Sequence, residues 1–284
     1  MDVNHHYLLQ LATELNDLRP GARILDYGCG NAEIVEEGRK KGLNFYGADI
    51  FYDPNPETRI GLQARGLLGD QVREIRDGRI PFEDESFDLV TSNMVFEHVE
   101  DMVAVLREVE RVLRPGGLVV ALFPTMEVWR EAHTGLPFVH WMRPNSVYRR
   151  NYALILRACG FGTFKTRPLT KWVGDLLGYL DRYVYYRPRN VVTELFSAHF
   201  SVDWIERHHV AYRLERSRLR FCKRLLNFPP FAWFATAAFN RLAFVGLVAR
   251  KPSDVEAAHI PAWVPKKLIG MSVPQVGSVE PDPS

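Results

Sequence analysis

The chain has 284 residues, of which 46% are hydrophobic and 25% are charged, and its formal net charge is +2. This length and composition suffice to bury a full hydrophobic core, and the small net charge gives no reason to expect a nucleic-acid partner. Cys29, Cys159 and Cys222 show neither metal-ligand spacing nor the pattern of a disulfide framework. Since no basic segment followed by an apolar one opens the chain, we expect no secretory signal and a cytoplasmic protein.

The first half of the sequence predicts short apolar strands that alternate with helices. Apolar residues recur at helical spacing from 4 to 18, and Pro20-Gly21 ends that segment. We therefore expect a lead-in helix within residues 1–22 that covers the sheet or the mouth of a cofactor site. Prolines and glycines in 51–66 favour a loop with at most one short helix. Further helices are expected at 31–41 and 101–113, and strands at 23–27, 44–49, 72–76, 87–92 and 118–123.

The second half has a different texture. Aromatic residues and histidines crowd into 129–148, and the tail 253–284 contains repeated prolines, which favours disorder. Both 161–169 and 200–213 have strand character, and which of them supplies the sixth strand stays open. Alternating strands and helices predict a parallel, doubly wound α/β sheet. Additional elements are expected as helices at 146–159 and twice within 171–198, and as a closing strand within 241–252.

A glycine pair, Gly28 and Gly30, directly follows the first predicted strand. Glycine lets the backbone turn from a strand into a helix and approach a ligand closely, with the amides of the helix N-terminus behind it. Asp49 ends the next strand. In nucleotide-binding α/β folds, an acidic residue about 20 positions after the glycine turn binds the ribose hydroxyls. A dinucleotide site has a third glycine where this chain has Glu33, which disfavours an NAD-linked oxidoreductase.

Three more segments follow the glycine segment 23–33 in order, at 80–90, 92–99 and 106–118. Together the four segments resemble the class I S-adenosylmethionine (SAM) methyltransferases, in particular the type 11, ubiquinone/menaquinone-methyltransferase-like family. The resemblance covers about residues 20–125. It implies a Rossmann-like, mostly parallel seven-stranded sheet with an antiparallel last strand. It also implies a methyltransferase domain over 23–252, in which 125–240 is an acceptor-side elaboration or lid.

The same resemblance implies SAM as the cofactor and assigns roles to single residues. Gly28 and Gly30 would lie against the methionine half and the ribose, and Asp49 would accept hydrogen bonds from both ribose hydroxyls. Asp26 would hold a water molecule or the amino end of SAM. The predicted cofactor-binding set is Asp26, Gly28, Cys29, Gly30, Asp49, Ile50, Asp77 and Asn93.

Two members of that set have alternatives. Asp77 would contact the adenine amino group, but Asp70 competes for this role because the spacing to the following Pro81-Phe82 pair departs from the family pattern. Asn93 ends the fourth strand, where the family's backbone meets the methionine moiety. Its backbone would act there whatever its side chain does.

Histidines are the candidates for catalysis. Transfer to a hydroxyl needs a base of near-neutral pKa, and His98 lies just past the fourth strand, where methyltransferases that act on oxygen often have a histidine. His133 and His140 are rival bases in the aromatic segment. His208 and His209 alternate faces if their region is a strand, so we expect no metal site.

These observations favour an O-methyltransferase that acts on a hydroxyl of a glycan, glycolipid or similar small acceptor. A quinone or other lipid-like acceptor, with transfer to oxygen, carbon or nitrogen, is the first alternative, and a non-catalytic SAM-binding module is the second. Basic residues in 207–224 followed by aromatic ones predict peripheral membrane contact, or a lipid-phosphate-linked substrate, through 207–239. The alternative interpretation of the same residues involves no membrane: a solvent-exposed strand end with basic side chains, followed by a helix that packs in the core. The oligomeric state stays open.

Overall fold

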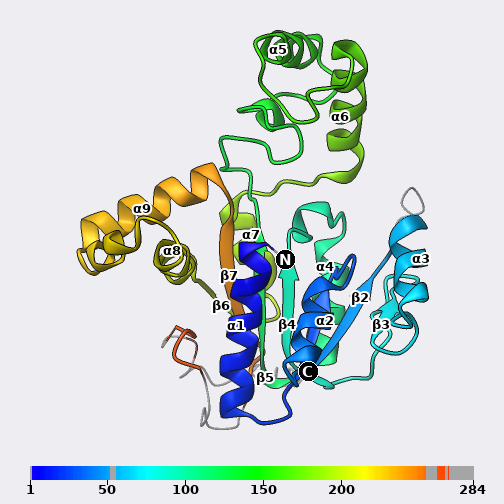
Figure 1. Ribbon diagram of the computed structural model, residues 1–284, viewed down its shortest axis with the longest axis vertical. Coiled ribbons are helices and arrows are strands. Elements are labelled where there is room, and N and C mark those ends of the chain that lie inside the picture. Colours follow the sequence, from blue (N-terminus) through cyan, green and yellow to red (C-terminus); the bar gives the residue numbers. More distant parts are fainter. Residues whose placement is uncertain (1, 52–55, 254–260, 266–267, 269–284) are drawn as a thin grey trace, which may run out of the picture.

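The alternating elements build one mixed sheet in the computed structural model of the protein, which describes residues 2–51, 56–253, 261–265 and 268. Within these residues the strand order is β3-β2-β1-β4-β5-β7-β6, and β7 alone runs opposite in direction to the other strands (Figure 1). The predicted Rossmann-like, mostly parallel seven-stranded sheet with an antiparallel last strand is confirmed. The strands are β1 Arg23–Tyr27, β2 Asn44–Asp49, β3 Val72–Glu74, β4 Phe87–Asn93, β5 Leu113–Phe123, β6 Ser201–Trp204 and β7 Val245–Arg250.

Helices cover both faces of the sheet, because strands buried on both sides send alternate side chains to each face. In β5, Val120 and Leu122 belong to the apolar cluster under α1 and α2, whereas Val119 and Ala121 belong to the cluster under α4 and α7. The helices are α1 Val3–Leu18, α2 Glu33–Lys40, α3 Pro56–Ala64, α4 Met102–Val112, α5 Val147–Ala158, α6 Leu169–Tyr183, α7 Arg189–Ser197, α8 Glu206–Glu215 and α9 Pro229–Leu242.

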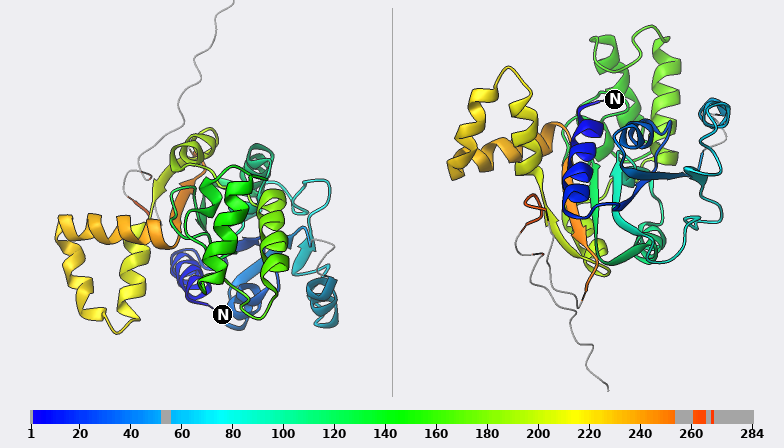
Figure 2. Two further views of the ribbon diagram at one scale, coloured as in Figure 1. Left: turned by 90° about the horizontal axis from the view of Figure 1, so that it is seen from above. Right: turned by 60° about the horizontal axis from the view of Figure 1, so that its bottom comes forward.

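Residues 124–184 form a head above the carboxyl ends of the strands, and Figure 2 shows it from above, lying over the sheet. The head contains α5, α6 and the 3₁₀ helix η2 (Val139–Trp141), and it has an apolar cluster of its own around Trp172. Inside it, the buried Arg149 pairs with Asp181 and donates to the Val139 carbonyl (3.0 Å). The head is therefore a packed unit that lies directly over the predicted site.

Residues 206–242 form an arm that projects from the edge of the sheet (Figures 1 and 2). The chain runs outward along α8, crosses the tip through the 3₁₀ helix η3 (Arg220–Asn227) and returns along α9 to β7. None of the described helices combines the length and hydropathy that crossing a lipid bilayer would require.

Two expectations about strands are wrong. Residues 161–169 form no strand, because Gly160 and Gly162 turn the backbone with φ of +88° and +94° and the Arg157 guanidinium donates to the carbonyls of Phe161, Thr163 and Phe164. Residues 200–213 supply the sixth strand only as far as Trp204, and helix α8 follows.

His208 and His209 consequently lie on a helix and not on a strand. Tyr7 of α1 stacks on His209 (ring centroids 4.4 Å apart), and its hydroxyl lies 2.8 Å from Nδ1 of His208. Burial against this helix lowers the pKa of His209 to about 3. Both histidines therefore join α8 to α1.

Part of the tail is ordered against the sheet. Trp263, Val264 and Leu268 are buried in the apolar cluster that includes α1, and Arg250 donates to the Leu268 carbonyl (3.0 Å). The expected disorder is wrong for these residues. The rest of the predicted disordered tail, 254–260, 266–267 and 269–284, lies outside the described residues.

Candidate active site

The glycine turn after β1 is built for a close approach. Gly28 has φ of +76°, and a Cβ there would lie 2.3 Å from the Val95 side chain, so the turn packs tightly against the loop after β4. Gly30 has φ of +48° and open space where its Cβ would lie. The left-handed backbone at both positions favours glycine. The second glycine therefore leaves room for a ligand in front of α2.

Asp49 joins the end of β2 to this turn. Its carboxylate accepts hydrogen bonds from the amides of Gly30 (2.8 Å, Oδ2) and Phe51 (3.0 Å, Oδ1). Each carboxylate oxygen keeps a second lone pair, which can accept from a hydroxyl group of a ligand. Ile50 follows with 42% of its side chain exposed, an apolar surface beside that carboxylate.

Asp26 is a buried carboxyl at the end of β1, and the Thr91 hydroxyl donates to it (3.0 Å). Burial raises the pKa of Asp26 to about 7; the hydrogen bond from Thr91 lowers it, and the charge of Asp49 adds to the increase. A cationic group placed beside this carboxyl would favour its ionised form.

The remaining predicted cofactor residues differ in what they offer. Cys29 is buried, and a Cβ on Gly47 would lie 2.7 Å from its sulfur, so its side chain packs against β2 and leaves only its backbone to a ligand. The Asn93 side chain accepts from Asn4 of α1 (3.0 Å), which likewise leaves its backbone. Asp77 lies in an exposed turn with φ of +52°, two residues beyond Ile75, whose amide donates to the Asp49 carbonyl (2.7 Å).

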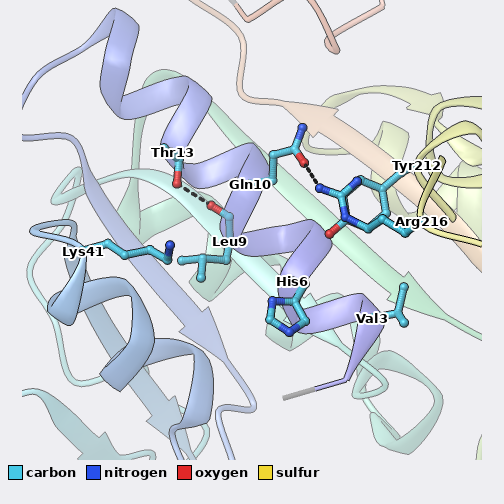
Figure 3. A pocket seen from close by; sticks show the side chains of 8 residues that line it. All are labelled: Val3, His6, Leu9, Gln10, Thr13, Lys41, Tyr212 and Arg216. Carbon is cyan, nitrogen blue, oxygen red and sulfur yellow. Dashed lines mark hydrogen bonds between the residues drawn. The ribbon is translucent and has the colours of Figure 1, made fainter.

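The amino end of α1 lies beside this edge of the sheet. In addition to the Asn4–Asn93 bond, His5 approaches Glu33 of α2 (3.8 Å). A hollow of about 500 Å³ follows another side of α1, between Lys41 and Arg216 (Figure 3). None of the predicted site residues lines that hollow.

Two of the three predicted bases meet. Nε2 of His98, in the 3₁₀ helix η1 (Phe96–His98), lies 3.3 Å from Nε2 of His133. Nδ1 of His98 faces the Tyr183 carbonyl (2.6 Å), and Nδ1 of His133 faces the Glu131 carboxylate (2.7 Å). Because a carbonyl and a carboxylate only accept, both Nδ1 atoms carry the hydrogen, and in the neutral rings both Nε2 lone pairs converge.

The pair is thus arranged to take up one proton. Burial lowers the pKa of His98, and its hydrogen bond to Tyr183 opposes that change, so the ring is neutral near pH 7. A proton placed between the two Nε2 atoms would relieve the repulsion of their lone pairs. Glu131 would balance the resulting positive charge.

Glu131 is a fully buried carboxylate that the sequence analysis missed. Burial favours its neutral form, but hydrogen bonds and charge from His133, together with the Thr134 amide (2.6 Å), outweigh burial and lower the pKa of Glu131 to about 2. The Tyr186 hydroxyl also donates to it (2.8 Å). An ionised Glu131 therefore fixes the tautomer and the orientation of His133.

Glu97 is a second missed carboxyl. Burial raises its pKa to about 8, the charge of Glu131 contributes to the increase, and among the described residues neither of its carboxyl oxygens has a hydrogen-bond partner. Its position directly before His98 was the sequence feature that could have identified it as a candidate site residue. Glu131 had a similar one, since it lies two residues before His133.

His140 is separate from the histidine pair. Its ring lies against Tyr186 (centroids 4.9 Å apart), and burial lowers its pKa. His140 and Tyr186 line a hollow of about 320 Å³ that is built mainly from residues of the head, including Met126 and Trp141, and is completed by Tyr185. The structure therefore places His140 in the wall of a pocket. Tyr186 lies between His140 and the group formed by Glu131, His133 and His98, because its ring contacts His140 and its hydroxyl donates to Glu131.

The first part of the chain is similar to a known protein family. The family model described as "Methyltransferase domain", of type 11, matches residues 25–121. Over residues 25–121 the chain is similar to the type 11 methyltransferase domain. The resemblance and the cofactor expected from the sequence, SAM, are thereby confirmed.

Relatives of the methyltransferase domain include demethylmenaquinone methyltransferases. Those of Bacillus cytotoxicus and Bacillus cereus are each 32% identical over 128 residues, which cover 41% of this chain and 52% of the relative. The chain thus spans about half the length of these relatives. A SAM-dependent methyltransferase structure from Mesorhizobium loti is similar at 19% identity and a TM-score of 0.47, covering 84% of this chain and 96% of that one.

The residues of the methyltransferase domain fit SAM. Its methionine end carries a cationic amino group, which suits the buried Asp26, and its ribose hydroxyls suit the free lone pairs of Asp49. The open space at Gly30 and the apolar surface of Ile50 lie beside these two acids. Among the described residues, no three His, Cys, Asp or Glu side chains gather in a way that would hold a metal ion.

Proposed function

We propose that the protein is a SAM-dependent methyltransferase that acts on a hydroxyl group of a small acceptor, with a glycan or glycolipid as the first candidate. The observation that carries this proposal is the convergence of His98 Nε2 and His133 Nε2 at 3.3 Å, with both Nδ1 atoms occupied. A hydroxyl acceptor must lose a proton, and this pair is positioned to receive it.

In the proposed reaction each group has one task. SAM, when bound, supplies an electrophilic methyl group on its sulfonium. Asp26, Asp49 and the turn at Gly28 and Gly30 align it, and the head excludes water from the acceptor. With SAM bound, the acceptor oxygen would displace the sulfonium sulfur from the methyl carbon. The hydroxyl proton passes to the His98–His133 pair, and S-adenosylhomocysteine leaves.

The proposal also assigns parts of the chain. Residues 23–252 form the methyltransferase domain, and 125–240 form its acceptor side. The hollow lined by His140 and Tyr186 would hold part of the acceptor, and exposed aromatic side chains nearby suit sugar rings as well as flat or isoprenoid groups. His98 and His133 do not line this hollow, and Tyr186, whose hydroxyl donates to Glu131, connects it to the pair. His140 is then a substrate contact.

A quinone or another lipid-like molecule is the second candidate acceptor. The similarity to demethylmenaquinone methyltransferases favours it. Identification of the methylated atom by mass spectrometry and NMR distinguishes transfer to oxygen, carbon or nitrogen.

The test is methyl transfer from radiolabelled SAM to cell extracts fractionated into glycans, lipids and small molecules. We expect His98→Ala and His133→Ala each to lower turnover by about 10²–10⁴-fold. His199→Gln is the matched control, because His199 pairs with Glu110 outside the site (2.5 Å). If turnover in both alanine variants stayed within a few-fold of wild type, the histidine pair would not be the general base. Binding of SAM without any transfer would support the non-catalytic module instead.

A further inference from the structure

The arm, residues 206–242, has a tip (216–234) that projects away from the sheet and from the helices on its two faces, among the residues that the structure describes (Figures 1 and 2). We propose that this tip docks on the surface of a lipid bilayer that contains anionic lipids. The inference does not depend on the proposed reaction, since none of the predicted catalytic residues, His98, His133 and His140, belongs to the arm.

The arm holds its own shape. Val210 of α8, Leu226 of η3 and Ala232 of α9 are buried together, with Phe231 and Phe239 packed against them. This small cluster ties the three segments to one another. The side chains that point away from it therefore form a surface of fixed geometry.

That surface is unusually apolar. Helix α9 contains no acidic residue and one basic residue, Arg241, yet only Ala232 of its side chains is buried. Helices that are apolar around most of their circumference are normally covered by protein or lipid. The exposed apolar residues of the tip are Leu219, Phe221, Leu225, Phe228, Trp233 and Phe234, with exposures from 47% to 73%.

The same tip is strongly basic. Residues 216–242 include six basic residues and no acidic one. Lys223 pairs with Glu215 of α8 (2.9 Å), and Arg216 lies over the Tyr212 ring (3.7 Å to its centroid). Arg218, Arg220 and Arg224 have no acidic partner among the residues that the structure describes, so their charge is available to an anionic surface.

Aromatic side chains that alternate with basic ones fit the interface of an anionic bilayer. There the rings enter the headgroup region and the guanidinium groups meet lipid phosphates. A second copy of the chain fits less well, because a symmetric pairing would bring two positive tips together. Since α9 is too short to cross a bilayer, the contact is peripheral.

The test is co-flotation of the full chain with vesicles of phosphatidylcholine alone or with added phosphatidylglycerol. We expect binding to the anionic vesicles that weakens with salt. Neutralisation of Arg218, Arg220 and Arg224 to Ser should reduce it by about fivefold per cation, given about 1 kcal/mol per basic residue. Trp233→Ser with Phe234→Ser should also reduce it at least tenfold.

The matched control is Phe161→Ser with Phe164→Ser, which removes two exposed aromatic rings from the head. It should leave flotation unchanged, and circular dichroism verifies that all variants fold. Equal flotation of wild type and the tip variants would overturn the proposal. A second result would also overturn it: wild type does not bind vesicles and is a dimer by light scattering, whereas the variant with Trp233→Ser and Phe234→Ser is a monomer.

Discussion

Asp26 is the residue whose environment predicts a measurable pH dependence. With its pKa raised to about 7 by burial, the carboxyl is mostly protonated at pH 6 and mostly ionised at pH 8. The ammonium group of SAM favours the ionised form. Binding is therefore weakened below the pKa and reaches its full strength above it.

We expect the affinity for SAM to increase about tenfold between pH 6 and pH 8, because each pH unit below the pKa costs about a factor of ten. Asp26→Asn removes the titrating group, so its affinity should be low and flat over this range. Calorimetric titration at several pH values measures both. If the affinity for SAM changed equally with pH in wild type and in Asp26→Asn, Asp26 would not be the source of the pH dependence.

At the scale of elements, the turn between β1 and α2 depends on Gly28. A Cβ at this position would meet the Val95 side chain at 2.3 Å, in a backbone with φ of +76°. We expect Gly28→Ala to destabilise the protein by about 2–4 kcal/mol, from left-handed strain and overpacking together. The free energy of unfolding in urea measures the change.

Gly61→Ala is the control for this substitution. Gly61 lies in α3 with no atom within 4 Å of the added Cβ, so alanine there should be neutral or slightly stabilising. Equal stability of the two variants would contradict the packing of the turn against Val95.

The sequence predicted most elements of the sheet because their signals are local. Apolar runs bounded by glycine, proline or charge mark β1, β2, β4, β5 and β7, whereas β3 (Val72–Glu74) has only one apolar residue. Residues 161–169 were predicted to have strand character, but Arg157 donates to three of their carbonyls, and no local pattern shows that contact. Residues 206–215 form a helix, in which His209 packs against α1 and Val210 packs against η3 and α9.

The candidate site divides in the same way. Gly28, Gly30 and Asp49 were predictable because their spacing follows one strand–turn–helix unit and the next strand. The partnership of His98 with His133 was not, although both were candidates, because the head must fold over the sheet before they meet. Glu131 and Tyr186 were missed for the same reason, since 55 residues separate them in sequence.

For the whole molecule, the structure implies unequal local stability. The sheet and its two helical layers contain most of the fully buried side chains, whereas three buried residues hold the arm together. We expect amide hydrogen exchange to be slowest in β4 and β5 and fastest, among the helices, in α9. Exchange measured by mass spectrometry tests this, and protection of α9 equal to that of β5 would contradict it.

The whole account depends on SAM lying across the turn at Gly28 and Gly30 with its ribose on Asp49. Calorimetric titration of wild type and Asp49→Ala with SAM and with NAD tests this most directly. We predict saturable binding of SAM, a loss of about 10–100-fold in Asp49→Ala from the missing charge-assisted hydrogen bonds, and no saturable heat with NAD. Unchanged SAM affinity in the variant, or saturable binding of NAD, would contradict the account.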